Sequence, residues 1–495
     1  MRPRATVILA ALLAILAGGM ASSCAARRDA PPAYEPPALY TQALEEAGAG
    51  KVSAAKQPTP AAGLAEAREA WERALAEPSP YSVFFLPAPR LLAALAPAAG
   101  DAALARKALA DGFTLETLEM LAYLRNPAVR AAESRFRSTL AAYGQVEELS
   151  DLLSQASAFT GGMGIESAAL FPYPAVMALQ GSLVTLEAGA SREDLEIARR
   201  DAVSRARRIF WELVYNGKAR DILGETLRLL SALPGAAAGR YETGAAPLSG
   251  LTDAVVRREK AREDLTSLER EAGALEARLA ALLDLPPGGG HVSPAQTLPS
   301  ADFPGPETLA RAALSRRQEI RKARIEVERV RTVILMMEAG ASFGRSFDAA
   351  LSPARVARTG DARGEPALPQ APGLAAPPYA YLEETRGVLQ SRKAELAAVS
   401  ADTPGLVRDA WTRADRARRE ARLYRGAVER LARLDFEAAK KSFETGQMSL
   451  GELVDLAIKR LDAKMSALAA ERDLGLSLAD LSEAVGAADL SSAGG

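Results

Sequence analysis

An internal repeat is the feature that most constrains what this chain can fold into. The segment Glu242-Thr243-Gly244 returns as Glu444-Thr445-Gly446, at a spacing of 446 − 244 = 202 residues. The match continues downstream without a gap, through the pairs Leu248/Leu450, Leu251/Leu453, Asp253/Asp455 and Arg258/Arg460. Each copy lies between two long runs of helical pattern, so the glycine-containing segment is typical of the tip of a helical hairpin. A repeat of this kind takes precedence over local motifs in assigning a fold.

The two copies also begin in step. Glu116-Thr117-Leu118 matches Glu307-Thr308-Leu309, at an offset of 307 − 116 = 191 residues. The offset therefore grows by 202 − 191 = 11 residues between the start and the tip, in the middle of the repeat where helical pattern fades. We predict two tandem copies of one plan: helix, irregular middle, long helix, tip, long helix.

The helix that follows the first tip carries a heptad seam. From Leu251 to Leu282, small or apolar residues recur at alternating steps of three and four, with Arg258 as the one exception. Shifted by 202 residues, a weaker seam runs from Leu453 to Ala484. Sustained heptads predict a coiled coil, and a helix of ~45 residues reaches about 70 Å.

Composition excludes several classes of function. The 495 residues carry a net charge of −1, which offers no basic footprint for nucleic acid. The single cysteine and the single histidine, Cys24 and His291, rule out an intrachain disulfide and leave little for zinc or Cys/His catalysis. We predict no enzyme, no cofactor and no metal site, and interpret His291 as an exposed linker residue.

The first 24 residues have the pattern of a secretory signal. Two arginines precede an apolar run, Ala5–Ala17, which is short for a membrane-spanning helix. Ala21-Ser22-Ser23-Cys24 resembles a bacterial lipobox, in which Cys24 would receive the lipid. The alternatives are an ordinary signal peptide cut nearby and an uncleaved anchor.

The middle of each copy has weak strand signals. Residues 171–187 contain few charges and several strand formers, so one or two strands are predicted there. Ser191 with Asp194 then indicates the capped start of a helix. The second middle runs from Ala339 to about Arg386, and the closing helical hairpin is predicted over Thr403 to Val485.

Asn126-Pro127, the two tips and the signal sequence together resemble the TolC-like outer-membrane efflux proteins, over roughly residues 114–486. Phe171-Pro-Tyr-Pro, with Phe210 to Tyr215 downstream, is most similar to the heavy-metal branch. The resemblance implies a mainly α fold in which tandem coiled-coil hairpins form a trimeric periplasmic tunnel. A few β-strands per protomer would contribute to a shared outer-membrane β-barrel.

The resemblance also implies the location and the partners. The chain would lie in the bacterial outer membrane with most of its length in the periplasm. It would assemble as a homotrimer with a periplasmic adaptor protein and an inner-membrane pump, contacting outer-membrane lipid and no nucleic acid. The chain divides into a signal (1–24), a Pro/Ala-rich tether (25–62), an N-terminal helical segment (63–113), repeat one (114–290), a linker (291–306), repeat two (307–486) and a tail (487–495).

No reaction chemistry is expected, so the candidate sites are contacts. By position in the family, the hairpin tips would dock the adaptor through Gly244, Ala245, Pro247, Leu248 and Ser249, with Gly446, Gln447, Met448, Ser449 and Leu450. The glycines could equally serve only as helix caps, and both roles are compatible.

Asp253 and Asp455 follow the tips, where a ring of carboxylates could favour cations at a tunnel entrance. The alternative is a pair of ordinary helical ion pairs, Asp253 with Arg257 and Asp455 with Lys459.

The sequence thus predicts the outer-membrane channel component of a tripartite efflux or type I secretion system, which conducts substrate passively from periplasm to exterior. The alternative is a lipid-anchored periplasmic coiled-coil scaffold whose barrel is lost or reduced. An adhesin is disfavoured by the duplication with matched tips.

Overall fold

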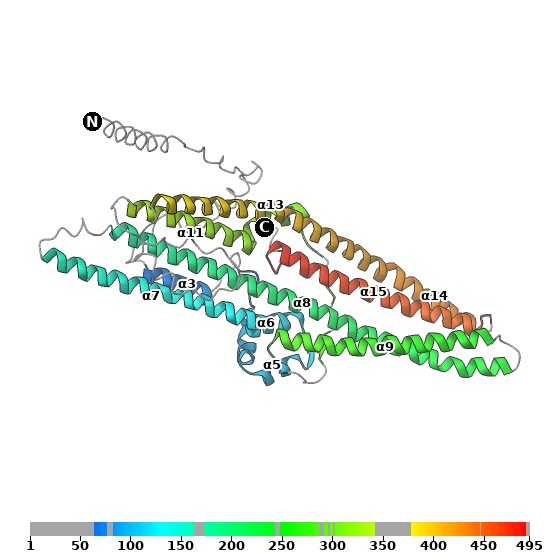
Figure 1. The fold of residues 1–495 in the computed structure, drawn as a ribbon. Coiled ribbons are helices and arrows are strands. Elements are labelled where there is room, and N and C mark those ends of the chain that lie inside the picture. The colour runs from blue at the N-terminus through cyan, green and yellow to red at the C-terminus, as the bar shows by residue number, and fades with distance from the viewer. Residues whose placement is uncertain are drawn as a thin grey trace, which may run out of the picture.

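The computed structural model shows an elongated array of long helices (Figure 1). It describes residues 64–76, 83–162, 173–242, 248–286, 292–295, 298–299, 302–341, 378–445 and 447–491. The helices are α3 (Leu64–Ala76), α4 (Pro89–Leu95), η2 (Ala96–Ala99), α5 (Ala102–Leu109), α6 (Leu115–Arg125), α7 (Pro127–Gly162), α8 (Tyr173–Glu242), α9 (Leu248–Leu282), α10 (Pro306–Arg316), α11 (Gln318–Ala341), α13 (Pro378–Leu423), the π-helical turn η4 (Tyr424–Val428), α14 (Glu429–Glu444) and α15 (Leu450–Val485). The chain is mainly helical, as predicted.

The elements follow the same order twice. A short helix, α6 or α10, ends at one extended residue, Asn126 (ψ 128°) or Arg317 (ψ 126°), and a longer helix begins directly after it. Asn126 caps that next helix, because its side-chain oxygen accepts from the backbone N–H groups of Ala128 (3.0 Å) and Val129 (3.3 Å). The single-residue break therefore redirects the chain without a loop.

The ends of the two returning helices also correspond. Asp284, just beyond α9, has φ 51°, and Gly486, which caps α15, has φ 78°. Their spacing is 486 − 284 = 202 residues, the same as that of the tips. Left-handed backbone stops a helix, and a Cβ on Gly486 would approach the Cα of Arg317 to 2.9 Å. Glycine is therefore needed in the second copy for two reasons.

The long helices lie side by side in a single layer (Figure 1). Around the hairpin tips, the order across the layer is α9, α8, α15, α14, and in the other half it is α7, α8, α11, α13. Helix α8, with 70 residues and a length of about 105 Å, extends through both halves. The ends of α8 and α14 and the starts of α9 and α15 lie at the same end of the molecule (Figure 1).

Several expectations for the middle of the repeats were wrong. Residues 173–187 are part of α8 and not strands, since Val184 and Ala188 are buried against α7. No helix starts at Ser191, which lies inside α8, and Asp194 instead accepts from Lys322 Nζ of α11 (2.9 Å). Burial on a neighbouring helix overrides a weak strand preference. Residues 342–377, in the second middle, lie outside the described residues.

The closing hairpin begins earlier than predicted. Helix α13 starts at Pro378 and continues through Pro404, so Thr403 does not mark its start. Proline inside a helix removes one backbone hydrogen bond. The residues just beyond it, Val407, Ala410 and Ala414, pack into a core with α10 and α15, which compensates for that loss.

The N-terminal helices pack on the middle of the layer and on α7. A core around Leu118, Phe210 and Leu275 joins α4 to α6 with α8 and α9. Helix α3 is held by Trp71, whose Nε1 donates to the Tyr143 hydroxyl (3.0 Å). Strand β1 (Asp111–Phe113) pairs in parallel with β2 (Ser293–Pro294). Within the described part of the chain, no helix is long and apolar enough to cross a membrane.

Candidate functional site

The second hairpin tip is a tight, well-capped turn. Helix α14 ends at Glu444, and the N–H of Gln447 donates back to the carbonyl oxygen of Ser442 (2.8 Å). Gln447 and Ser449 are exposed, and Met448 is half-buried. The helix cap at this turn is Thr445, whose hydroxyl donates to the Lys441 carbonyl oxygen (3.2 Å).

Helix α15 begins at this tip with a reciprocal cap. The Glu452 N–H donates to the Ser449 hydroxyl (3.3 Å), and the Ser449 N–H donates to the Glu452 carboxylate (2.9 Å). The backbone and hydroxyl hydrogen bonds from Ser449 lower the pKa of Glu452. Ser449-Leu450-Gly451-Glu452 fits the S-x-x-E pattern of a capping box, which could have been recognised in the sequence. The turn therefore presents a defined shape at the end of the molecule.

Most of the first tip falls outside what the structure describes. That applies to Gly244, Ala245 and Pro247, as it does to Gly446, Cys24 and His291. Leu248 and Ser249 are the first two residues of α9, which places their backbone at the same end as Gln447. Leu450 is the first residue of α15.

Asp455, the carboxylate beyond the second tip, does not form the predicted pair within its own helix. Arg257 of α9 donates to Asp455 of α15 (2.8 Å), so this ion pair links the two hairpins. Lys459 approaches Asp435 of α14 (3.8 Å) and not Asp455. The expected Asp455–Lys459 pair was therefore wrong, because a neighbouring helix supplies a closer cation. The side chain of Asp253 lies outside the described residues.

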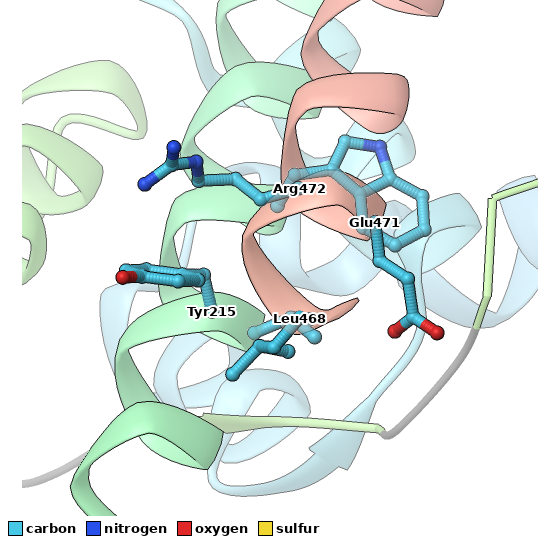
Figure 2. Close-up of a pocket in the computed structure, with 6 residues that line it drawn as sticks. Tyr215, Leu468, Glu471 and Arg472 are labelled. Atoms are coloured by element: carbon cyan, nitrogen blue, oxygen red, sulfur yellow. The ribbon is translucent and has the colours of Figure 1, made fainter. Parts of the chain in front are cut away.

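A second charged cluster, formed by Lys218, Arg425 and Glu471, joins the two hairpins. Glu471 of α15 lies 4.0 Å from Lys218 Nζ of α8 and 4.0 Å from Arg425 Nη1 of η4. Burial raises the pKa of Glu471, against the attraction of the two cations. The neighbouring Arg472 guanidinium lies 4.4 Å from the centre of the Tyr215 ring, and Figure 2 shows Arg472 and Glu471 pointing to opposite sides of α15. Ordinary helix periodicity did not reveal this cluster.

This cluster borders a small hollow between α8 and α15. Its lining is Trp211, Val214, Tyr215, Leu468, Glu471 and Arg472 (Figure 2). Gly475 adjoins it, where a Cβ would meet the Trp211 ring at 2.4 Å. The hollow is too small for a substrate and is a feature of close helix packing.

A more open groove lies where α7, α8 and α9 meet, and its charges are also structural. Arg208 donates to Asp480 (2.8 Å) and Glu483 (2.6 Å) of α15, and Arg278 lies 3.7 Å from Glu212. These pairs hold α8 to its neighbours. Among the described residues, no group of histidine, cysteine and acidic side chains could hold a metal ion.

The helices form an elongated layer of paired long helices with a capped hairpin turn at one end, an architecture shared with solved structures of outer-membrane channels. The sequence matches no family model and no curated protein. The likeness is therefore structural, and it extends over most of the chain.

Three solved structures illustrate it. CusC, studied for transmembrane channel formation, has a TM-score of 0.55 at 14% identity, over 77% of this chain and 93% of that chain. A membrane protein from Pseudomonas aeruginosa has a TM-score of 0.53 at 16% identity, over 77% of this chain and 95% of that one. The open-state MtrE outer-membrane channel of Neisseria gonorrhoeae has a TM-score of 0.53 at 14% identity, over 75% of this chain and 89% of that chain. At these identities the likeness establishes the fold.

Proposed function

We propose that this protein is the outer-membrane channel component of a tripartite efflux or type I secretion system. As a homotrimer it would conduct substrate passively from the periplasm to the exterior and catalyse no reaction. A β-barrel shared by the three copies would cross the outer membrane, and most of the chain would lie in the periplasm. Lipidation of Cys24 would add an anchor in outer-membrane lipid.

The observation that carries this proposal is the open, one-layer arrangement of the helices. Near the tips, the described residues place α9 beside α8 and α14 beside α15, so each outer helix has a long helix on one side, and the stability of helices of this length comes mostly from packing. Copies that join edge to edge around an axis would cover them and enclose a tunnel. The fold shared with CusC and MtrE supports this assembly.

The direct test is conductance across a planar lipid bilayer, with the oligomer size of the mature, detergent-extracted protein measured alongside. We expect discrete current steps that co-purify with a trimer. A folded trimer that never conducts would contradict the channel and leave the assembly intact.

The hairpin tips are the proposed docking site for a periplasmic adaptor protein, which would connect the channel to an inner-membrane pump. The capped turn around Gln447 is exposed and lies at the end of the molecule. A photo-crosslinking residue at Gln447, used in the native host, should capture the adaptor. Gly446→Asp should abolish that crosslink and leave folding largely intact, since an aspartate adds bulk and charge to the turn.

Gly387→Asp is the matched control for the tip. Gly387 lies near the far end of α13, and a Cβ there meets nothing within 4 Å. It receives the same substitution at a site remote from the tip, so crosslinking should persist. Unchanged crosslinking in Gly446→Asp would count against docking at the tip.

The lengths of the helices also support a second candidate function, a lipid-anchored periplasmic scaffold. Helix α7 extends to Gly162 and α8 begins at Tyr173, which leaves 172 − 162 = 10 residues between them. A strand that crosses a bilayer needs about 9–11 residues, and a hairpin needs two such strands. A conductance measurement that shows no steps would favour this scaffold.

A further inference from the structure

Three buried polar atoms for which the described residues offer no hydrogen-bond partner lie at the junction of the second repeat, where α10 gives way to α11 and α15 ends. They are the Ser204 hydroxyl oxygen of α8, Nη1 of Arg317 and the side-chain oxygen of Gln318. Ser204 and Gln318 are both 0% exposed, and Arg317 is the extended residue between α10 and α11. Buried polar atoms in folded proteins nearly always have a partner, so these three atoms require one.

Contacts on both sides of Ser204 place it against this junction. Four residues before it, Arg200 donates to Glu319 of α11 (2.6 Å). Three residues after it, Arg207 donates to the Ser482 hydroxyl of α15 (2.9 Å). Residues three and four apart share one face of a helix. Ser204 therefore faces the point where α11 begins and α15 ends.

Arg317 and Gln318 meet the end of α15 at the same point. The Gln318 amide nitrogen donates to the Gly486 carbonyl oxygen (3.1 Å), and a Cβ on Gly486 would lie 2.9 Å from the Arg317 Cα. Nε of Arg317 lies 3.1 Å from Glu319, the carboxylate that Arg200 of α8 also contacts. The Arg317 guanidinium therefore lies on the α8 side of the junction.

The equivalent junction of the first repeat is closed by direct hydrogen bonds. Arg125 donates to the carbonyl oxygens of Leu283 (2.9 Å) and Asp284 (3.0 Å). Asn126 donates to the backbone of α9 and accepts from the backbone of α7. Among the described residues, neither Arg125 nor Asn126 has a buried side-chain atom without a partner. Arg317 occupies the position of Asn126 (317 − 126 = 191), so the exchange of these residues leaves the second junction with unmatched polar atoms.

The chemistry of the three atoms selects their partner. Nη1 of Arg317 can only donate, so the partner must accept a hydrogen bond. The Gln318 amide nitrogen already donates to Gly486, which leaves the Gln318 oxygen as an acceptor, so the partner must also donate. A metal ion cannot accept and a proton-free anion cannot donate. A water molecule does both, and the Ser204 hydroxyl can supply its third hydrogen bond.

We propose that one buried water molecule binds at this junction, accepting from Arg317 Nη1, donating to the Gln318 oxygen and sharing a hydrogen bond with the Ser204 hydroxyl. Buried waters in proteins typically make about three hydrogen bonds. The water joins α8 of the first repeat to the start of α11 in the second, beside the ion pair between Arg200 and Glu319. All of its ligands belong to one chain, so the site does not depend on the proposed trimer or channel.

A crystal structure of the full chain, fine enough to show ordered water, tests the site directly. We expect one water oxygen within about 3.2 Å of all three atoms. A Ser204 hydroxyl bonded to a carbonyl oxygen of its own helix, with no water between it and Gln318, would overturn the proposal.

Ser204→Ala gives an energetic test whose sign decides. With the water in place, alanine removes one of its partners, and the equilibrium constant for unfolding should rise about tenfold. Without the water, alanine would remove an unsatisfied buried hydroxyl, and the protein would become more stable. Ser482→Ala is the matched control, because this buried hydroxyl has protein partners, Arg207 (2.9 Å) and the Ala479 carbonyl oxygen (2.8 Å), and its loss should destabilise in either case. Denaturant unfolding, followed by circular dichroism, measures both variants.

A double-variant cycle separates the water from a hydrogen bond within α8. Gln318→Met removes a second partner of the water. If the water connects the two side chains, S204A/Q318M should destabilise the protein by less than the sum of the single variants, because the second change removes contacts already weakened by the first. Strict additivity, or a more stable Ser204→Ala, would count against the site, and neither result bears on whether the protein conducts.

Discussion

Gly273 and Gly475 are equivalent residues of the two hairpins, 475 − 273 = 202 positions apart, but their surroundings differ. A Cβ on Gly273 in α9 would meet nothing within 4 Å, whereas a Cβ on Gly475 in α15 would lie 2.4 Å from the Trp211 ring. The indole of Trp211 is 6% exposed and cannot move away easily. The two glycines therefore have different physical roles at one repeat position.

Alanine at these two positions should change stability in opposite directions. Gly273→Ala should raise the free energy of unfolding by about 0.5–1 kcal/mol, because glycine in a helix interior loses more backbone entropy than alanine. Gly475→Ala should lower it by about 1–3 kcal/mol through overpacking against Trp211. Denaturant unfolding, followed by circular dichroism, measures both. A stabilised Gly475→Ala would show that the ring is not confined there.

At the scale of elements, ion pairs join the two repeats along α8. Arg200 of α8 donates to Glu319 of α11 (2.6 Å), and Arg321 lies 2.7 Å from Glu193. Burial alone would raise the pKa of Glu319, but Arg200 and Arg317 outweigh it, so the pKa lies below its usual value. Glu319 is thus held ionised at the junction of the repeats.

Glu319→Gln should destabilise the protein in a pH-dependent way. A carboxyl group with a lowered folded-state pKa stabilises the fold above its unfolded-state pKa, and this contribution is lost as the pH falls through the folded-state value. We expect the free energy of unfolding to fall by about 2 kcal/mol at neutral pH, because the charged hydrogen bond between Glu319 and Arg200 is removed. Arg200 then still pairs with Asp201. The difference in the free energy of unfolding between the variant and the wild type should shrink below about pH 4.

Glu328→Gln is the control for this pH experiment. Glu328 pairs with Arg331 on the same helix, and the two side chains are 42% and 48% exposed. An exposed pair contributes at most about 1 kcal/mol. Unfolding curves recorded across the acidic range would contradict the prediction if the two variants behaved alike.

The full extents of α8 and α13 could not be predicted from the local sequence. The hairpin tips and the long helices of both repeats were predicted from periodicity. The sequence did not predict that α8 continues through residues 173–187, because this continuation depends on burial of Val184 and Ala188 against α7. The same holds for α13, whose passage through Pro404 depends on the core with α10 and α15.

At the scale of the whole molecule, the protein is a layer with two unlike edges. In the proposed trimer these edges meet those of other copies, so association depends on protein concentration, whereas the folding of one copy does not. Dilution should therefore dissociate the trimer before the helices unfold, and sedimentation in detergent alongside circular dichroism measures both.

The sequence by itself determined the plan of this protein. The 202-residue repeat, the heptad seams and the Gly-containing tips predicted two helical hairpins, because these features arise from contacts between residues near in the chain. Only the tertiary structure decided which side chains meet. It placed Arg257 against Asp455 of the other hairpin, and Gly475 against Trp211. Such contacts depend on how four helices align in space, and helical periodicity carries no information about the level at which neighbouring helices lie.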